Sequence, residues 1–257
     1  MIFVGIVYDE KKEKAKGLAN KVKKYLESRN CRVCSEKLET VLKKSDLVIT
    51  FGGDGLVLHT ADKISNQNRT IPLFRVNFGR IGFLTNVEPK EAFKRIDDFL
   101  GSKYIIVRKS RIEVEIRSRK NSNSIIKANA LNEIVIERTQ ARALSFQVMV
   151  NNHEKIERQG DGLIFSTRTG SSAYNRSVGG PILIKENRFL LTVISPVVRE
   201  KSFYFVRSAD SIFRILKISG ETRIVVDGKH LLKISEDDLV TIKKSPQNTL
   251  FMEFGDL

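Results

Sequence analysis

The first hundred residues alternate between short apolar runs and amphipathic stretches. Residues 2–8 form an apolar run of strand type, and residues 10–29 carry apolar side chains at helical spacing. The same alternation continues along this part of the chain, with strands predicted over 32–35, 46–51 and 71–76 and helices over 56–64 and 89–100. Strands that alternate with helices imply right-handed crossovers, so we predict a Rossmann-like α/β domain with a mostly parallel sheet.

After about residue 102 the pattern changes to alternation rich in β-branched residues, which is typical of half-buried strands. The predicted strands cover residues 105–116, 125–137, 144–150, 189–194, 212–218, 223–226 and 239–242. Short polar pairs that tolerate positive φ, Asn151-Asn152 and Asp227-Gly228, predict hairpin turns, and residues 117–124 predict an exposed hairpin tip. The second part of the chain is therefore expected to be β-rich, antiparallel and sandwich-like.

These patterns predict a domain boundary near residue 102. The N-terminal α/β domain covers residues 1–102, the C-terminal β-rich domain covers residues 103–244, and residues 245–257 are expected to pack back on the first domain.

Composition limits the classes of protein that fit. The 257 residues are 41% hydrophobic and 29% charged, which excludes a disordered chain. We expect neither a transmembrane span nor a signal peptide, because no run of eighteen apolar residues occurs and a lysine-rich amphipathic stretch follows the apolar start. The only two cysteines, Cys31 and Cys34, lack the neighbours of a zinc site, so we predict two buried thiols in a reducing cytoplasm, with a redox Cys-x-x-Cys pair as the alternative.

The net charge of +15 predicts an anionic partner without identifying it. Phosphorylated metabolites, nucleic acid and anionic membranes all carry the required sign. The basic residues are scattered along the chain, which is typical of a solvated surface.

A glycine-rich turn is the first candidate site. Gly52, Gly53, Asp54 and Gly55 follow a buried strand and precede a helix, where backbone amides and the helix N-terminus favour phosphate. Neither the dinucleotide fingerprint nor the P-loop pattern is satisfied. A carboxylate beside phosphates needs a metal ion or a proton to accept, so Asp54 indicates phosphoryl transfer. The alternative is a tight turn in which Asp54 caps the helix.

Three further blocks make the pattern specific. They are residues 77–84 (NFGRIGFL), residues 131–133 (LNE), and residues 160–175 (GDGLIFSTRTGSSAYN), which run on to Gly179-Gly180-Pro181-Ile182. With GGDG, in this order and spacing, they resemble the NAD kinase family over roughly residues 1 to 245. The resemblance implies a two-domain kinase that phosphorylates the 2′-hydroxyl of the adenosine ribose of NAD with ATP or polyphosphate, giving NADP.

The same resemblance implies roles for individual residues. Asp54 matches the proposed general base, and Gly52, Gly53 and Gly55 match positions along the phosphates of the donor. The implied NAD contacts are Asp54, Gly55, Phe83, Asn132, Glu133, Asp161, Thr169, Ser172, Ala173, Tyr174 and Ser177. The chemistry agrees, because amides, carboxylates, hydroxyls and an aromatic ring are the groups that bind bases and riboses.

Each candidate also has a plainer interpretation. Asn132 and Glu133 are equally typical of a strand surface, Tyr174 is typical of core packing, and the Asp227-Gly228 turn, which matches a late Asp-Gly of the family, fits an ordinary hairpin. Arg168 departs from the family, which usually has proline there, and either binds a phosphate of the dinucleotide or lies in solvent.

The late part of the chain departs from the family pattern, and the sequence predicts no metal site built by protein side chains. Residues 197–201 lack the histidine usual in the family, and the three histidines His59, His153 and His230 follow no pattern, so we interpret them as surface or turn residues. No cluster of carboxylates predicts a protein-built metal site, so Mg²⁺ is expected to be held mainly by the donor phosphates.

Two other functions remain open at this point. A lipid or sphingoid-base kinase is the first, because such families also resemble this chain in having GGDG on a similar scaffold; a non-catalytic nucleic-acid-binding protein is the second. The NAD kinase resemblance implies small-molecule substrates, no nucleic acid or membrane partner, and a homo-oligomer, dimer or tetramer, joined through the β-rich domain.

Overall fold

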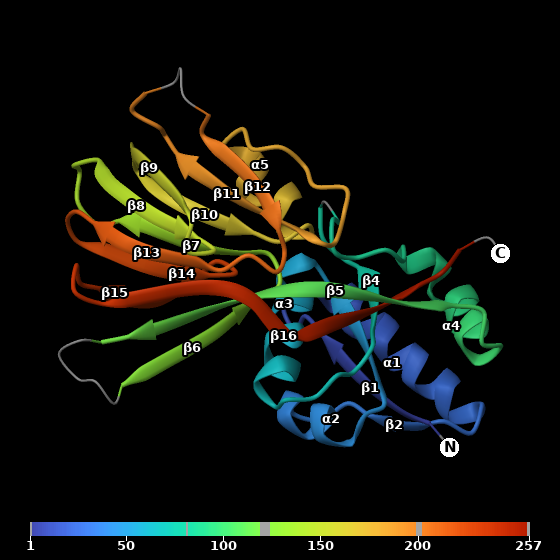
Figure 1. The fold of residues 1–257 in the computed structure, drawn as a ribbon. Helices are drawn as coiled ribbons and strands as arrows, with labels where there is room; N and C mark the ends of the chain where they lie inside the picture. Colours follow the sequence, from blue (N-terminus) through green and yellow to red (C-terminus); the bar gives the residue numbers. More distant parts are fainter. Residues whose placement is uncertain (1, 81, 119–123, 199–201, 256–257) are drawn as a thin grey trace. The chain divides into compact units, whose positions relative to one another are not determined.

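The computed structural model describes residues 2–80, 82–118, 124–198 and 202–255 (Figure 1). The chain divides into two compact units, residues 1–109 with 247–257, and residues 110–246. The predicted limits, 102 and 244, differ from this division because strands β5 (Ile105–Arg117) and β16 (Leu239–Glu253) each run without interruption from one unit into the other. The roles that the sequence suggests for the two domains stay predictions.

The first unit is built on a parallel sheet of strand order β2-β1-β3-β4. Its strands are β1 (Phe3–Tyr8), β2 (Arg32–Cys34), β3 (Leu47–Gly52) and β4 (Leu73–Asn77). Every residue of β3 is buried, because a central parallel strand is covered on both faces. The end of β16 pairs with β4 in parallel, through Phe251 and Leu73. The predicted Rossmann-like arrangement is confirmed.

Helices connect the strands (Figure 1). They are α1 (Glu13–Ser28), α2 (Leu38–Lys44), α3 (Asp54–Asn66), the 3-10 turn η1 (Pro89–Glu91) and α4 (Ala92–Leu100). The buried apolar residues of α1 and α4 belong to one core with those of the sheet. The core of this unit includes Met252 from the end of the chain, and Phe254 packs on Phe74 with ring centroids 4.9 Å apart. No helix in the described part of the chain is long and apolar enough to cross a membrane.

The second unit contains two packed sets of strands. One is a six-stranded antiparallel sheet of order β12-β11-β10-β7-β14-β15. Its strands are β7 (Glu133–Arg138), β10 (Gly162–Ser166), β11 (Arg188–Ile194), β12 (Tyr204–Ser208), β14 (Thr222–Val226) and β15 (Lys229–Ile234).

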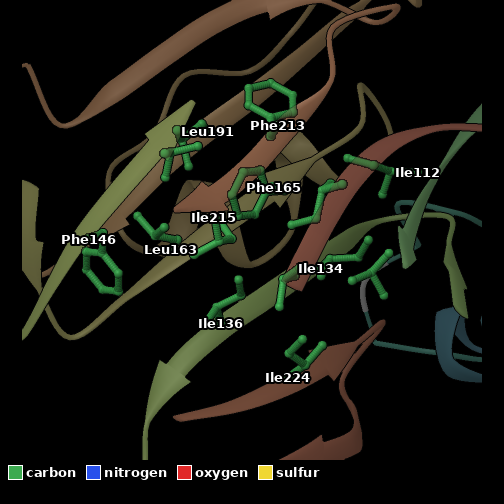
Figure 2. Packing of buried hydrophobic residues seen from close by; sticks show 14 of the residues in the cluster. Ile112, Ile134, Ile136, Phe146, Leu163, Phe165, Leu191, Phe213, Ile215 and Ile224 are labelled. Atoms are coloured by element: carbon green, nitrogen blue, oxygen red, sulfur yellow. The ribbon is translucent and has the colours of Figure 1, made fainter. Parts of the chain in front are cut away.

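The other set pairs β16 with β13 (Phe213–Ile218), β13 with β8 (Leu144–Val150) and β8 with β9 (Glu154–Gly160), all antiparallel. Strand β5 pairs with β6 (Ile125–Ala130). Phe165 from the six-stranded sheet meets Phe213 from this second set with ring centroids 5.4 Å apart, and Figure 2 shows both in one apolar core. The predicted β-sandwich is therefore confirmed.

The turn predictions hold where the structure describes them. Asn151 and Asn152 have φ of 50° and 65°, and Asp227 and Gly228 have φ of 47° and 76°, as tight hairpins require. The tip predicted over residues 117–124 joins paired strands β5 and β6, and residues 119–123 lie outside the described residues.

Several strands were missed or given the wrong ends. The pattern did not predict β9, β10, β12 or β15, and it ended β16 at residue 242. One strand predicted over 125–137 is in fact β6 and β7, with Leu131 and Asn132 between them. This break matters for function, because it turns the chain at one of the candidate motifs.

Candidate functional site

The glycine-rich turn lies at the carboxyl end of β3. Strand β3 ends at Gly52, Gly53 is the N-cap of α3, and Asp54 is the first residue of that helix. A Cβ atom on Gly53 would lie 3.4 Å from Cα of Gly79, and the Phe78 amide donates to Gly52 O at 2.8 Å. The turns that follow β3 and β4 therefore touch, at the edge of a parallel sheet where ligands bind.

Asp54 faces the loop after β4. Its carboxylate accepts hydrogen bonds from the backbone N–H groups of Phe83 at 3.0 Å and Leu84 at 3.1 Å. The alternative that Asp54 caps its helix is wrong, because the N-cap is Gly53 and no side-chain hydrogen bond caps this helix end. Two amide donors fix the carboxylate in one orientation and leave each oxygen a second lone pair for a ligand.

A buried arginine supports the same loop. Arg75 is 2% exposed, donates to Leu84 O at 2.7 Å and pairs with Glu253 at 2.7 Å. Burial lowers the pKa of Arg75, and Glu253 and then Asp54 oppose this shift through their negative charges. The Phe83 side chain is 59% exposed. The sheet edge thus holds an oriented carboxylate, a buried cation and an open aromatic ring.

The second cluster begins at the break between β6 and β7. Asn132 and Glu133 are 7% and 6% exposed, so the interpretation of this pair as a strand surface is wrong. Asp227, from the β14–β15 turn, accepts hydrogen bonds from the backbone N–H groups of Leu131 at 2.7 Å, Asn132 at 2.8 Å and Glu133 at 3.1 Å. The sequence predicted only a hairpin at Asp227. It did not predict the contact with Glu133, from which Asp227 is separated by 94 positions in the chain.

Four buried polar atoms around this break have no hydrogen-bond partner among the described residues. They are Asn132 Oδ1, Glu133 Oε2, Ser166 Oγ and Thr169 Oγ1. They belong together, because Ser166 is the register partner of Glu133 and a Cβ on Gly170 would lie 2.1 Å from Asn132 O. Buried polar groups are nearly always hydrogen-bonded, so this group of atoms fits a polar ligand.

The carboxyl group of Glu133 has an unusual affinity for its proton. Burial, and secondarily the negative charge of Asp227, raise the pKa of Glu133 to about 8. Burial also raises the pKa of Tyr174, and the charges of Glu137, Asp161 and Glu133 raise it further. Glu133 and Tyr174 therefore share one electrostatic environment.

The remaining residues of this block lie on a short helical segment. It comprises η2 (Gly170–Ser172) and α5 (Tyr174–Ser177). Tyr174 is 38% exposed, so the core-packing interpretation is wrong. Ser172 donates to Thr169 O at 3.1 Å, Ala173 is half-buried, and exposed Ser177 donates to Ala173 O at 3.5 Å.

One buried residue that the sequence did not single out holds this segment in place. Asn175 donates to Ser171 O and Pro181 O, each at 2.9 Å, and accepts from Thr192 Oγ1 at 2.7 Å. It lies inside the GSSAYN block, so its place in the motif was the available signal, but its role depends on contacts that only the fold creates.

Two charged residues of the second unit are engaged with protein groups. Asp161 pairs with Arg138 at 3.0 Å. Arg168 donates to Ile184 O at 2.8 Å and pairs with Glu186 at 3.2 Å. Arg168 therefore bridges two points of its own segment and does not extend into solvent alone.

The other titratable candidates form no site. Among the described residues, no group of three or more His, Cys, Asp or Glu side chains could hold a metal ion. Cys31 and Cys34 are free thiols, and burial raises the pKa of Cys31, which disfavours a reactive thiolate. His153 lies in a turn, as predicted, His59 is half-buried on α3, and the backbone of His230 lies in β15.

An aspartate on a glycine-rich turn and a buried polar cluster in a β-sandwich define a nucleotide-binding phosphotransferase of two units. Known proteins agree with this class: the ATP-NAD kinase N-terminal domain family matches residues 37–104, and the ATP-NAD kinase C-terminal domain family matches residues 131–254. The chain belongs to the NAD kinase family. The predicted family, fold class and kinase function are confirmed, and the lipid-kinase and nucleic-acid alternatives are not favoured.

Relatives and solved structures give the extent of the similarity. The bifunctional NADP phosphatase/NAD kinase of Methanocaldococcus jannaschii is 33% identical over 97% of this chain, which spans 44% of that protein. The NAD kinase of Buchnera aphidicola is 32% identical over 89% of this chain and 77% of its own length. The crystal structure of yeast NADH kinase complexed with NADH aligns with a TM-score of 0.87 at 21% identity, covering 99% of this chain and 84% of that one.

Proposed function

We propose that this protein transfers the γ-phosphoryl group of ATP, or a terminal phosphoryl group of polyphosphate, to the 2′-hydroxyl of the adenosine ribose of NAD. The 2′-oxygen forms the new P–O bond, the bond to ADP or the shortened polyphosphate breaks, and Asp54 accepts the hydroxyl proton. The observation that carries this proposal is the Asp54 carboxylate, which two backbone amides orient at the carboxyl edge of the parallel sheet.

The glycines of the same turn are proposed to bind the donor. Gly52, Gly53 and Gly55 bring the backbone amides at the start of α3 close to phosphate oxygens, where the helix N-terminus adds partial positive charge. Gly55 is exposed, and nothing lies within 4 Å of the position that its Cβ would take. Mg²⁺ is proposed to arrive with the donor phosphates and to neutralise the charge that develops on them.

NAD is proposed to bind the residues that the resemblance implies. In the first unit these are Asp54, Gly55 and Phe83, and the exposed ring of Phe83 can stack on a base. In the second unit they are Asn132, Glu133, Asp161, Thr169, Ser172, Ala173, Tyr174 and Ser177. The unpartnered oxygens of Asn132, Glu133 and Thr169 support this assignment.

The cellular setting is also a proposal. We propose a cytoplasmic homo-oligomer, dimer or tetramer, joined through the β-rich domain. Exposed apolar side chains on β12, Tyr204 and Val206, support an interface there. Light scattering on the purified protein decides between monomer, dimer and tetramer.

The test is NADP formation from NAD, Mg²⁺ and either ATP or polyphosphate, read with an NADP-specific dehydrogenase. We expect product from the wild type and a loss of about 10²- to 10⁴-fold in turnover for Asp54→Asn, because a positioned base contributes about that much. NAD binding by the variant, followed calorimetrically, should be retained. Near-normal turnover of Asp54→Asn would contradict the role of Asp54, and no product with either donor would contradict the function.

A further inference from the structure

We propose that Glu133 binds NAD as a neutral carboxyl group, which donates a hydrogen bond to an acceptor atom of the dinucleotide, and that Asp227 positions it. This inference rests on the proposed function, and it concerns the state of one binding residue. A neutral carboxyl donates one hydrogen bond, whereas a carboxylate only accepts.

The first observation is the rigidity of the chain at Glu133. Asp227 accepts from three consecutive backbone N–H groups, Leu131 to Glu133, and its own N–H donates to Glu133 O at 3.1 Å. The turn that carries Asp227 and the start of β7 are thus joined by four hydrogen bonds. The Asp227 carboxylate therefore fixes the backbone position of Glu133, and with it the position of the Glu133 Cβ atom.

The second observation is that Glu133 lacks a cationic partner. Glu133 is 6% exposed, and in the part of the chain that the structure describes its Oε2 has no hydrogen-bond partner. Among the ion pairs of the described residues, none involves Glu133. A buried carboxylate without a cation or donors is costly, so the group gives up its charge by keeping its proton.

The charges around Glu133 favour the same state. Asp227 from the β14–β15 turn is the carboxyl group that faces it, and Tyr174 from α5 is the other titratable neighbour, with Asp161 and Glu137 close to Tyr174. Burial raises the pKa of Asp227, and its three amide donors and the positive charge of Arg111 only partly oppose this rise. Three N–H donors stabilise a carboxylate at Asp227, whereas Glu133 Oε2 has no such donor among the described residues, so of the two groups Glu133 is the one that we assign the proton.

A neutral Glu133 suits a dinucleotide. NAD offers acceptors on its adenine ring, its ribose oxygens and its carboxamide, all of which can take a hydrogen bond from a carboxyl group. Its pyrophosphate is anionic, and a second buried carboxylate beside Asp227 would repel it. The proton on Glu133 thus adds a donor and removes a repulsion.

The experiment is calorimetric titration of NAD into the whole protein between pH 6.5 and 9.0, at constant ionic strength. For the wild type we expect a constant dissociation constant up to about pH 7.5 and a rise of roughly tenfold by pH 9, as the neutral fraction of Glu133 falls. Glu133→Gln keeps a donor that cannot ionise, so its dissociation constant should stay flat and lie below that of the wild type at pH 9.

Two further variants test whether the pH dependence of NAD binding comes from Glu133 or from any nearby carboxyl group. Glu137→Gln removes a negative charge on the same strand, where Glu137 pairs with Arg223 at 2.8 Å, and should keep the rise above pH 7.5. Asp227→Asn removes the negative charge near Glu133 and should lower the pKa of Glu133, so the rise in the dissociation constant should begin at lower pH. Circular dichroism checks that each variant is folded.

Three outcomes would overturn the inference. A flat wild-type profile would do so, and so would a Glu133→Gln variant that binds NAD at least tenfold more weakly than the wild type at pH 6.5, since the carboxylate would then be the binding form. NAD binding with a flat profile leaves the proposed function intact. A wild type that binds no NAD at any pH contradicts both proposals.

Discussion

Phe83 and Asp54 are joined by a hydrogen bond of 3.0 Å from the backbone N–H of Phe83 to the carboxylate of Asp54, across 29 residues of sequence. The Phe83 ring takes no part in this bond and is 59% exposed. The backbone of this residue therefore orients the proposed base, while its side chain is free to contact a substrate. The two roles can be separated by substitution.

Phe83→Ala should weaken NAD recognition without disabling the base. The amide bond to Asp54 remains, whereas the loss of an aromatic contact costs about 0.5–1.5 kcal/mol, so we expect KM for NAD to rise roughly 2- to 10-fold with kcat little changed. Steady-state kinetics of NADP formation measures both. A fall in kcat of a hundredfold with an unchanged KM would show that the ring acts on the chemistry.

Glu133→Gln should change how stability depends on pH. A carboxyl group whose pKa is raised to about 8 on folding stabilises the fold fully below its ordinary pKa of 4.5, and this contribution is lost as pH rises towards 8. The wild type therefore loses stability relative to the variant across that window, by about 1.4 kcal/mol per pH unit at most. Urea unfolding of both proteins at pH 5, 6.5 and 8 measures the difference, and a constant difference would refute a raised pKa.

Gly170→Ala should destabilise the second unit. A Cβ on Gly170 would lie 2.1 Å from Asn132 O, so either η2 or the Asn132 backbone must shift. Overpacking of this kind costs about 1–3 kcal/mol, and the shift should also weaken NAD binding. Thermal unfolding and NAD titration check both effects.

Gly17→Ala is the matched control for that substitution. Gly17 lies inside helix α1 with nothing within 4 Å of its Cβ position, so alanine should stabilise the protein by about 0.5–1 kcal/mol. If Gly170→Ala were as well tolerated as Gly17→Ala, the contact between η2 and Asn132 would not be tight in solution.

Arg168→Ala should leave the KM for NAD within about twofold of the wild type. The guanidinium is engaged with Ile184 O and Glu186, and this ion pair is partly exposed, so its loss costs about 1 kcal/mol of stability or less. Kinetics and urea unfolding test the two statements. A tenfold rise in KM would favour the alternative, a bond from Arg168 to a phosphate of the dinucleotide.

Sequence reasoning succeeded where local chemistry decides the structure. Residues 47–51 (LVITF) are apolar except for Thr50 and are followed by glycines, which is sufficient to place a buried strand before the GGDG turn. Asn151-Asn152 and Asp227-Gly228 adopt positive φ because their residue types tolerate it. The order of the four motifs was likewise sufficient to identify the family.

Prediction from the sequence failed where contacts with distant parts of the chain determine the local structure. Strand β9 has the sequence EKIERQG, which carries a single buried apolar side chain, Ile156, and this segment is a strand because β8 pairs with it along its whole length. The burial of Arg75 depends on Glu253, and that of Glu133 on the turn at Asp227; neither partner is near in sequence.

The sequence by itself thus determined the alternating strands and helices of the first unit, the family and the residue types of the candidate site, because periodicity, glycine placement and motif spacing are local properties. Only the tertiary structure decided that the Phe83 backbone holds Asp54 and that Glu133 lies near the charge of Asp227. The physical reason is that burial and electrostatic environment arise from packing between distant segments. Those two quantities set the protonation states on which the proposed chemistry depends.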